Sequence, residues 1–210
     1  MPHYVSSNSF CIIDNFALTD FRLVTFEKYI VSLARLPIAE SSLPKLSIPD
    51  IKTKNLSRIL EFRLGRHLAQ IILSSKFNCS ESVGRDDSGA PVFPFGFNGS
   101  ISHTQTDSHI YAAACISPAN IRCGVDIEHR SRTLTPKIVA RLANQELEVN
   151  CLKDETERMR WFQRKEATYK ALYPMFPVLS SFTCVVSEDF TKVVYSLDSA
   201  FKEIVLASCS

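Results

Sequence analysis

Hydrophobic residues return at helical spacing along one stretch of the N-terminal half. Between Asn55 and Leu73 they recur every three or four positions, which predicts a long helix with one buried face. The earlier segment Phe16–Leu36 is also rich enough in apolar residues to predict a helix, which Pro37 would end. Between these segments, the two prolines of Ser41–Pro49 predict a loop.

Two further helices are predicted in the C-terminal half. Thr135–Leu152 begins with a good helix signature, since Thr135 can act as the N-cap and Pro136 suits the first helical position. Glu155–Leu172 is a second long helical stretch, and it ends near Pro174, which cannot continue a helix. The C-terminal half is therefore expected to hold two successive helices.

Short apolar runs predict strands. Ile110–Ile116 reads as a buried strand, and Ile121–Glu128 reads as a second strand after a turn at Ser117–Asn120. The segment Cys79–Gly99 is rich in Gly, Pro, Asp and Ser, so it is expected to be mostly loop. Further β-like runs lie at Ser181–Val186, Thr191–Leu197 and Phe201–Ala207.

The predicted elements run as helices followed by strands, twice over. This order predicts an α+β protein built from two halves of similar size, residues 1–117 and 118–210. No sequence identity relates the halves, so the idea of a duplication rests on the element order alone.

Composition narrows the class of protein. The chain has 210 residues, of which 45% are hydrophobic, and a net charge of +2 gives no general attraction to nucleic acid or membrane. The apolar runs are far shorter than the roughly 20 residues of a spanning helix, and the N-terminus lacks a signal-peptide pattern. Seven scattered cysteines fit thiols in a reducing cytosol. We therefore expect a cytoplasmic protein without a membrane span or a nucleic-acid partner.

Two acidic residues lie at alternate positions of the second predicted strand. Because strand side chains alternate, Asp126 and Glu128 project from one face while Val125 and Ile127 project from the other. Two adjacent carboxylates repel each other unless a positive charge lies close by, and magnesium prefers such oxygen ligands. A strand that turns its polar face to water explains the same pattern, so the pair alone leaves both interpretations open.

The last predicted helix carries an acid and a lysine on one face. Glu166 and Lys170 are four residues apart, so they share a side of the helix. A metal at Glu166 and a phosphate at Lys170 would satisfy both groups. The same spacing is also that of an ordinary surface ion pair, and Arg164 and Lys165 are either solvated or extend a basic rim.

Two upstream segments offer donors for an anion. Ser102 and His103 follow a loop rich in Gly and Pro, where the backbone can approach a ligand closely. Arg58 and Arg66 lie on the predicted helix. A structural histidine and an amphipathic helix with its arginines in water are the alternatives. A nucleophilic serine also stays open, although the chain lacks a GxSxG motif.

Four motifs, in this order, resemble those of the 4′-phosphopantetheinyl transferases, and they are closest to the enterobactin-type branch of siderophore and peptide synthesis. The motifs are RILEFRLGR at Arg58–Arg66, GAPVFPFGFNGSISH at Gly89–His103, GVDIE at Gly124–Glu128 and WFQRKEATYKA at Trp161–Ala171. The last two are the most specific. Phe93 stands where relatives often carry tryptophan, which keeps an aromatic ring at that position.

The resemblance implies a metal and phosphate site in the C-terminal half. Asp126, Glu128 and Glu166 match the magnesium ligands of the family. Lys170 matches the lysine that binds the phosphates of coenzyme A. Together with Glu166 it would form the catalytic pair, and Glu166 is our choice for the base that accepts a proton.

The resemblance also implies contacts to the coenzyme from the N-terminal half. Ser102 and His103 match a Ser-His pair that contacts coenzyme A, including its 3′-phosphate. Arg58 and Arg66 fall where the family often contacts nucleotide phosphates. Glu146 resembles the glutamate of a loosely kept middle motif and is carried over only as an accessory residue.

The implied protein is a magnesium-dependent transferase that moves phosphopantetheine from coenzyme A to a serine of an apo-acyl, peptidyl or aryl carrier protein and releases 3′,5′-ADP. The implied fold is a pseudo-twofold pair of α/β subdomains with the active site between them, and we expect a monomer. Three alternatives stay open: a metal-dependent nucleotidyl or phosphodiester enzyme, a non-catalytic carrier-binding module, and a small trimeric acyl-carrier synthase, whose chains are usually much shorter.

Overall fold

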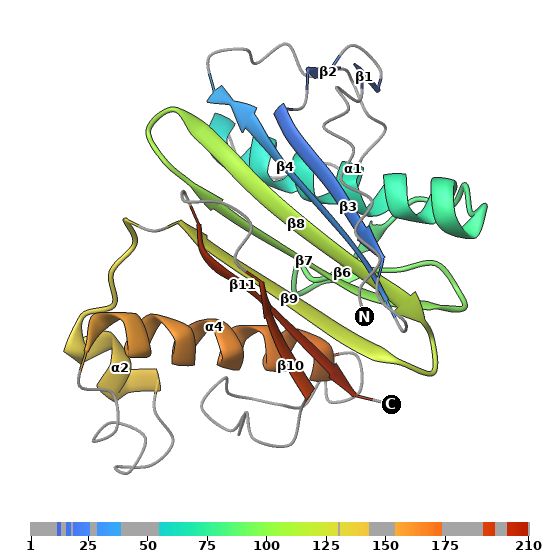
Figure 1. Ribbon diagram of the computed structural model, residues 1–210. Coiled ribbons are helices and arrows are strands. Elements are labelled where there is room, and N and C mark those ends of the chain that lie inside the picture. Colours follow the sequence, from blue (N-terminus) through green and yellow to red (C-terminus); the bar gives the residue numbers. More distant parts are fainter. Residues whose placement is uncertain are drawn as a thin grey trace. The chain divides into compact units, whose positions relative to one another are not determined.

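The computed structural model describes residues 12–13, 16–17, 19–25, 29–38, 55–129, 131–142, 154–173, 191–195 and 201–209 (Figure 1). The chain divides into two compact units, Met1–Ile121 and Arg122–Ser210. Each unit contains an antiparallel sheet with a long helix packed against it.

The first unit is built on an antiparallel sheet in the order β3-β4-β8-β7. Its strands are β3 (Thr19–Thr25), β4 (Ile30–Pro37), β7 (Phe97–Gln105) and β8 (His109–Pro118). Two small two-stranded pairings accompany it, formed by β1 (Ile12–Ile13) with β2 (Phe16–Ala17) and by β5 (Gly84–Arg85) with β6 (Pro91–Val92).

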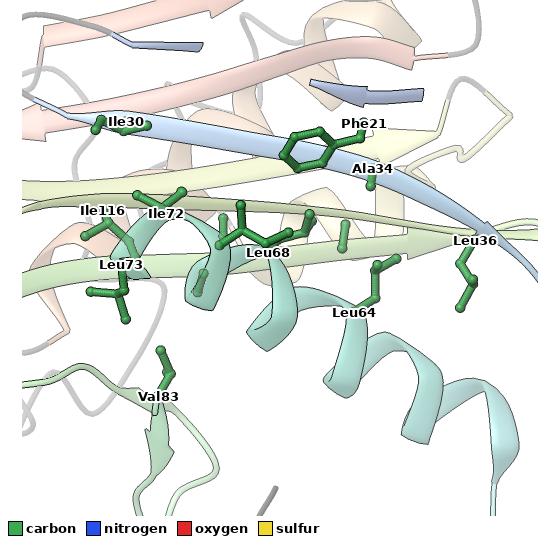
Figure 2. Close-up of a cluster of buried hydrophobic side chains, with 14 of the residues drawn as sticks. Phe21, Ile30, Ala34, Leu36, Leu64, Leu68, Ile72, Leu73, Val83 and Ile116 are labelled. Atoms are coloured by element: carbon green, nitrogen blue, oxygen red, sulfur yellow. The ribbon is translucent and has the colours of Figure 1, made fainter. Parts of the chain in front are cut away.

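Helix α1 (Leu56–Phe77) packs on this sheet, as its predicted apolar face requires. The side chain of Asn55 caps its first turn, and Asn78 ends it in the left-handed conformation that asparagine tolerates. Figure 2 shows Leu68 and Ile72 of the helix turned toward the strands, and both are fully buried. This cluster is the core of the first unit.

The segment Phe16–Leu36 was predicted to be a helix, and this prediction is wrong, because its described residues form strands β2, β3 and β4. The reason lies in burial. Residues Ile30 to Ala34 are all buried, so β4 is apolar or small on both faces and lacks the polar alternation of a half-exposed strand. An apolar run of this kind cannot be told from a buried helix by periodicity alone.

The second unit holds a sheet in the order β10-β11-β9, again antiparallel. Its elements are β9 (Arg122–His129), α2 (Pro136–Leu142), α4 (Glu155–Leu172), β10 (Thr191–Tyr195) and β11 (Phe201–Cys209). Helix α4 packs on β9 and β11 (Figure 1). Its first turn is capped by Asp154, whose side chain accepts a hydrogen bond from the Glu157 amide at 2.7 Å.

Gly124 allows helix α4 to lie directly on β9. A Cβ atom at this position would collide with the backbone carbonyl oxygen of Ala167, and it would also meet the amide nitrogen of Ala171 at 2.8 Å. Only glycine permits so close an approach of two backbones. The strand face that includes Gly124 is therefore the face that α4 covers.

From β4 onward, and apart from the small β5–β6 pairing and the short helix α2, the two units share one order of elements. In the first unit β4 is followed by α1, β7 and β8, and β8 pairs between β4 and β7. In the second unit β9 is followed by α4, β10 and β11, and β11 pairs between β9 and β10. The helix-and-strand order expected from the sequence is thus present in each unit, although a strand and not a helix opens it.

Several predicted elements are confirmed. The predicted long helix is α1, Glu155–Leu172 is α4, Ile110–Ile116 lies within β8 and Ile121–Glu128 nearly coincides with β9. Thr135 accepts a hydrogen bond from the Ile138 amide, as an N-cap does, and α2 confirms the start of the predicted helix Thr135–Leu152, whereas residues 143–152 lie outside the described residues. The late run Thr191–Leu197 contains β10, and Phe201–Ala207 lies within β11, whereas Ser181–Val186 lies outside the described residues.

Candidate active site

The acidic pair of β9 is buried in the second unit. Asp126 and Glu128 are only 2% and 3% exposed, and they share the α4 face of the strand with Gly124. Val125 and Ile127, on the opposite face, are fully buried. The alternative of a polar strand face in water is therefore wrong. Burying two adjacent carboxylates has a large cost unless positive charge compensates them.

Lys170 of α4 supplies part of this compensation. Its Nζ atom lies 2.8 Å from Asp126 Oδ1 and donates a further hydrogen bond to the Val125 carbonyl at 3.3 Å. It lies 3.7 Å from Glu166 Oε2, one turn earlier on the helix. Lys170 therefore connects the acid of the helix to an acid of the strand, and the Glu166–Lys170 pair is not an ordinary surface ion pair.

Arg132 supplies the second cation. It follows β9 in the segment that leads to α2, and its backbone amide donates a hydrogen bond to the His129 carbonyl at 3.0 Å. Its guanidinium donates to Glu128 Oε1, and it also stacks 5.3 Å above the ring of Phe162. Glu128 thus has its own arginine, just as Asp126 has its own lysine.

The buried charges shift the pKa values of these groups. Burial raises the pKa of Glu128; the hydrogen bond from Arg132 opposes this shift, and the charge of Asp126 adds to it. Burial also raises the pKa of Glu166, against the opposing charge of Lys170. Burial alone would lower the pKa of Lys170, but the charges of Asp126 and Glu166 raise it above the usual lysine value. Lys170 is therefore held in its cationic form.

These side chains suit a magnesium ion by their chemistry. Three carboxylates offer the hard oxygen ligands that magnesium prefers, and a bound cation would oppose the burial that raises the pKa of Glu128 and Glu166. Among the described residues, no three acidic, histidine or cysteine side chains already converge as a metal cluster. Lys170 and Arg132 hold the acids instead, so a bound cation would have to share them with these two residues.

A second cluster of polar side chains lies in the first unit, between α1 and β7. Glu61 is buried in α1, and its Oε2 atom lies 3.4 Å from Arg58 Nη1 and 3.5 Å from His103 Nδ1. Burial works to raise the pKa of Glu61, but the hydrogen bond and charge of His103, together with Arg58, hold it below the usual value. One carboxylate therefore connects two of the predicted coenzyme contacts.

Arg66 lies in a different cluster of the same unit. Its guanidinium stacks 3.4 Å above the ring of Phe62 and donates to the Gly84 carbonyl at 3.2 Å, and Arg85 lies 5.7 Å from the same ring. Burial, with the charge of Arg85, lowers the pKa of Arg66 to about 10. Two neighbouring guanidinium groups on one aromatic ring form a site that favours an anion.

Ser102 and His103 follow the segment rich in Gly and Pro, as predicted, and lie on strand β7. The two side chains therefore point to opposite faces of the sheet. His103 shares the α1 face with Ile101, whose side chain fills the space above Gly65. Ser102 lies on the other face and is buried at 5% exposure. One phosphate therefore cannot be contacted by both side chains in the way that a loop would allow.

The structure brings together most of the predicted residues in two groups. Asp126, Glu128, Glu166 and Lys170 form one cluster, and Arg58 and His103 meet at Glu61. Glu146 lies outside the described residues. Lys165, expected to be solvated or part of a basic rim, is fully buried, with its Nζ atom 5.1 Å from the Trp161 ring.

Sequence reasoning missed three residues of these clusters. They are Glu61, Arg85 and Arg132. Glu61 is part of a quoted motif, and its spacing of three from Arg58 on a helix could have suggested the pair. Arg132 is four residues from Glu128 but outside a helix, so no spacing rule would have paired them.

Comparison with known protein families gives two consecutive matches. Residues 50–117 match the 4′-phosphopantetheinyl transferase N-terminal domain, and residues 122–204 match the 4′-phosphopantetheinyl transferase superfamily. No curated protein matches the chain. The matches coincide with the two clusters, which offer cations for phosphate groups in the first unit and buried carboxylates beside a lysine in the second.

These features define the class of enzymes that transfer phosphate-containing groups. The chain belongs to the 4′-phosphopantetheinyl transferase superfamily, and it is therefore a transferase. Members of this family use coenzyme A as the donor, usually with a divalent metal, and act on carrier proteins. Within the described residues, none of the helices is long and apolar enough to cross a membrane.

Proposed function

We propose that this chain is a magnesium-dependent 4′-phosphopantetheinyl transferase of the holo-acyl-carrier-protein synthase type, related to the enterobactin branch of the family. The observation that carries the proposal is the buried cluster on β9 and α4, in which Asp126 and Glu166 both lie within ion-pair distance of Lys170. A surface ion pair does not need a buried strand carboxylate as a third member.

Asp126, Glu128 and Glu166 would hold the magnesium ion. The ion would supply Lewis-acid stabilisation of charge on the diphosphate of coenzyme A. Lys170 is held cationic beside Asp126 and Glu166, so it can bind a phosphate oxygen without first gaining a proton. These residues would orient the diphosphate and neutralise the charge that develops on it.

The proposed reaction is a displacement at phosphorus. The hydroxyl oxygen of a carrier-protein serine attacks the β-phosphorus of coenzyme A, and the bond from this phosphorus to the bridging oxygen breaks, so that 3′,5′-ADP leaves with the electron pair. Glu166 accepts the proton of the serine.

The first unit would bind the nucleotide part of coenzyme A. Arg58 and Arg66 would contact its phosphates, and His103 would contact the 3′-phosphate, while Ser102 would need a separate contact from the other face of β7. We accordingly assign residues 1–117 to nucleotide binding and residues 118–210 to the metal and to chemistry. The shared element order of the two units supports the pseudo-twofold fold of the family.

The acceptor would be an apo-carrier protein of siderophore, nonribosomal peptide or polyketide synthesis. The proposal places the protein in the cytoplasm, because coenzyme A and carrier proteins occur there. It also takes the protein to be a monomer. The thiol forms of Cys79, Cys115 and Cys123 fit a reducing compartment.

The test is holo-carrier formation by variants of the two catalytic residues. Glu166→Gln removes the base, and Lys170→Ala removes the phosphate-binding cation, so we expect each to reduce turnover by about 100-fold or more. Lys137→Ala, which removes one exposed charge from α2, is the matched control and should leave turnover unchanged. Near-wild-type turnover in either active-site variant would show that the assignment is wrong.

A further inference from the structure

Arg132 occupies an unusual position for a half-exposed side chain. Its side chain is 47% exposed, yet it contacts Glu128, whose side chain is only 3% exposed. Burial works to lower the pKa of Arg132, but the hydrogen bond and charge of Glu128, with the charges of Asp126 and Glu166, raise it. Its guanidinium therefore lies where the buried acidic cluster meets solvent.

The guanidinium is held in this position from two sides. It stacks above Phe162, which lies one turn before Glu166 on α4 and is buried in a small core with Met159, Leu134 and Val139. The turn from His129 fixes its backbone. An arginine anchored in this way loses little side-chain entropy when it binds an anion, because its position is already set.

A charge balance indicates what Arg132 can do. The cluster has three carboxylates and two cations, Lys170 and Arg132. With the magnesium ion of the proposed function added, the net charge becomes plus one, which attracts a diphosphate. Without Arg132 the same sum is zero, and the attraction is lost. Arg132 is thus needed to make the net charge of the site positive, as well as to pair with Glu128.

We propose that Arg132 is a second phosphate-binding cation of the active site, which contacts the diphosphate of coenzyme A from the side opposite its anchor on Phe162. The guanidinium presents several N–H donors in one plane, and this geometry matches phosphate oxygens. Arg132 would bind substrate and neutralise charge in the reaction. The inference rests on the proposed function, since it takes coenzyme A as the ligand.

The test is direct binding of coenzyme A by calorimetry, in the presence of magnesium and without a carrier protein. Arg132→Ala should weaken binding by about 10- to 100-fold, as expected for the loss of a charge-assisted hydrogen bond. Dephospho-coenzyme A keeps the diphosphate but lacks the 3′-phosphate, so Arg132→Ala should weaken the binding of this analogue by the same factor as it weakens the binding of coenzyme A. Lys137→Ala is the control for a general loss of positive charge and should bind as the wild type does.

A pair of conservative variants separates binding from a merely structural role. Arg132→Lys keeps the positive charge, whereas Arg132→Gln keeps only a group that can hydrogen-bond to Glu128. We expect the lysine variant to bind coenzyme A more tightly than the glutamine variant, with circular dichroism showing both folded. This pair decides the question even if Arg132→Ala does not fold.

Two results would overturn the inference. One is coenzyme A binding within about twofold of wild type in Arg132→Gln, which is far below the expected loss. The other is an equal loss in the lysine and glutamine variants. Lys170→Ala distinguishes the failure of this inference from the failure of the proposed function. If the Lys170→Ala variant also binds coenzyme A as tightly as wild type, the whole phosphate site is wrong. If the Lys170→Ala variant loses affinity while the Arg132 variants do not, only the role of Arg132 is wrong.

Discussion

At the scale of single residues, buried charges with named partners define both clusters. Asp126 is compensated by Lys170 and Glu128 by Arg132, and each partner comes from outside the strand that carries the acids. Glu61 plays the comparable part in the first unit, between Arg58 and His103. Removing one member of such a buried pair destabilises a protein because the other member keeps its burial cost.

Glu61 leads to a prediction about pH. Its pKa in the folded protein lies below the ordinary value of 4.5, so the folded state binds the proton less tightly than the unfolded chain does. The stabilisation is therefore complete at neutral pH and is lost as the pH falls below 4.5 through the folded pKa. Glu61→Gln should lower the free energy of unfolding at pH 7 by about 1 kcal/mol.

Urea denaturation of wild type and variant across a range of pH measures this effect. The difference between the two proteins should shrink as the pH falls below 4.5. Glu81→Gln, at an exposed position, is the control and should match wild type throughout. A difference that stays constant down to pH 3 would mean that the carboxylate charge of Glu61 does not contribute.

At this scale, the residues that could be predicted from the sequence are those placed by the periodicity of a strand or a helix. The same-face placement of Asp126 and Glu128, and of Glu166 and Lys170, follows from the periods of strand and helix, and the structure bears out both. The contact between Lys170 and Asp126 joins positions 44 residues apart, and only the fold can show it. Sequence alone therefore gave each half of the cluster but not its burial.

At the scale of elements, packing of a helix on a sheet positions each cluster. Helix α1 places Glu61 next to His103 of β7, and helix α4 places Lys170 next to Asp126 of β9. Both helices were predictable from apolar spacing, although α1 continues four residues beyond its predicted end at Leu73. The strands β3 and β4 could not be predicted in the same way, because buried residues on both faces of β4 remove the alternation of polar and apolar residues that marks a strand.

Gly124 gives the prediction at this scale. In Gly124→Ala the new Cβ would collide with the backbone of α4, so the helix must move away from β9. We expect a loss of stability of about 1–3 kcal/mol or more, as overpacking usually costs. A shift of α4 would also separate Lys170 from Asp126, so holo-carrier formation should fall further than the stability loss alone would cause.

Thermal and urea unfolding, with turnover measured well below the melting temperature, test this expectation. Gly84→Ala is the matched control, because a Cβ there would meet Val92 at an ordinary 3.6 Å. If Gly124→Ala were as stable and as active as Gly84→Ala, close packing of α4 on β9 would not be what positions the cluster.

At the scale of the whole molecule, one chain combines two units with the same order of elements but different chemistry. The first presents cations, Arg58 and the Arg66–Arg85 pair, and the second presents buried acids with Lys170 and Arg132. In the proposed function, the cations of the first unit would bind phosphates of the nucleotide, and the acids of the second unit would hold the metal.

The most direct test of the central claim is the intact mass of apo-carrier proteins after incubation with this chain, coenzyme A and magnesium. The panel should include peptidyl, aryl and acyl carriers, each beside a variant whose acceptor serine is replaced by alanine. We expect at least one carrier to gain the mass of one phosphopantetheine group, with the serine variant unchanged and the gain lost when a chelator removes the metal. A folded chain that binds coenzyme A but leaves every carrier at its apo mass would contradict the proposed transferase function.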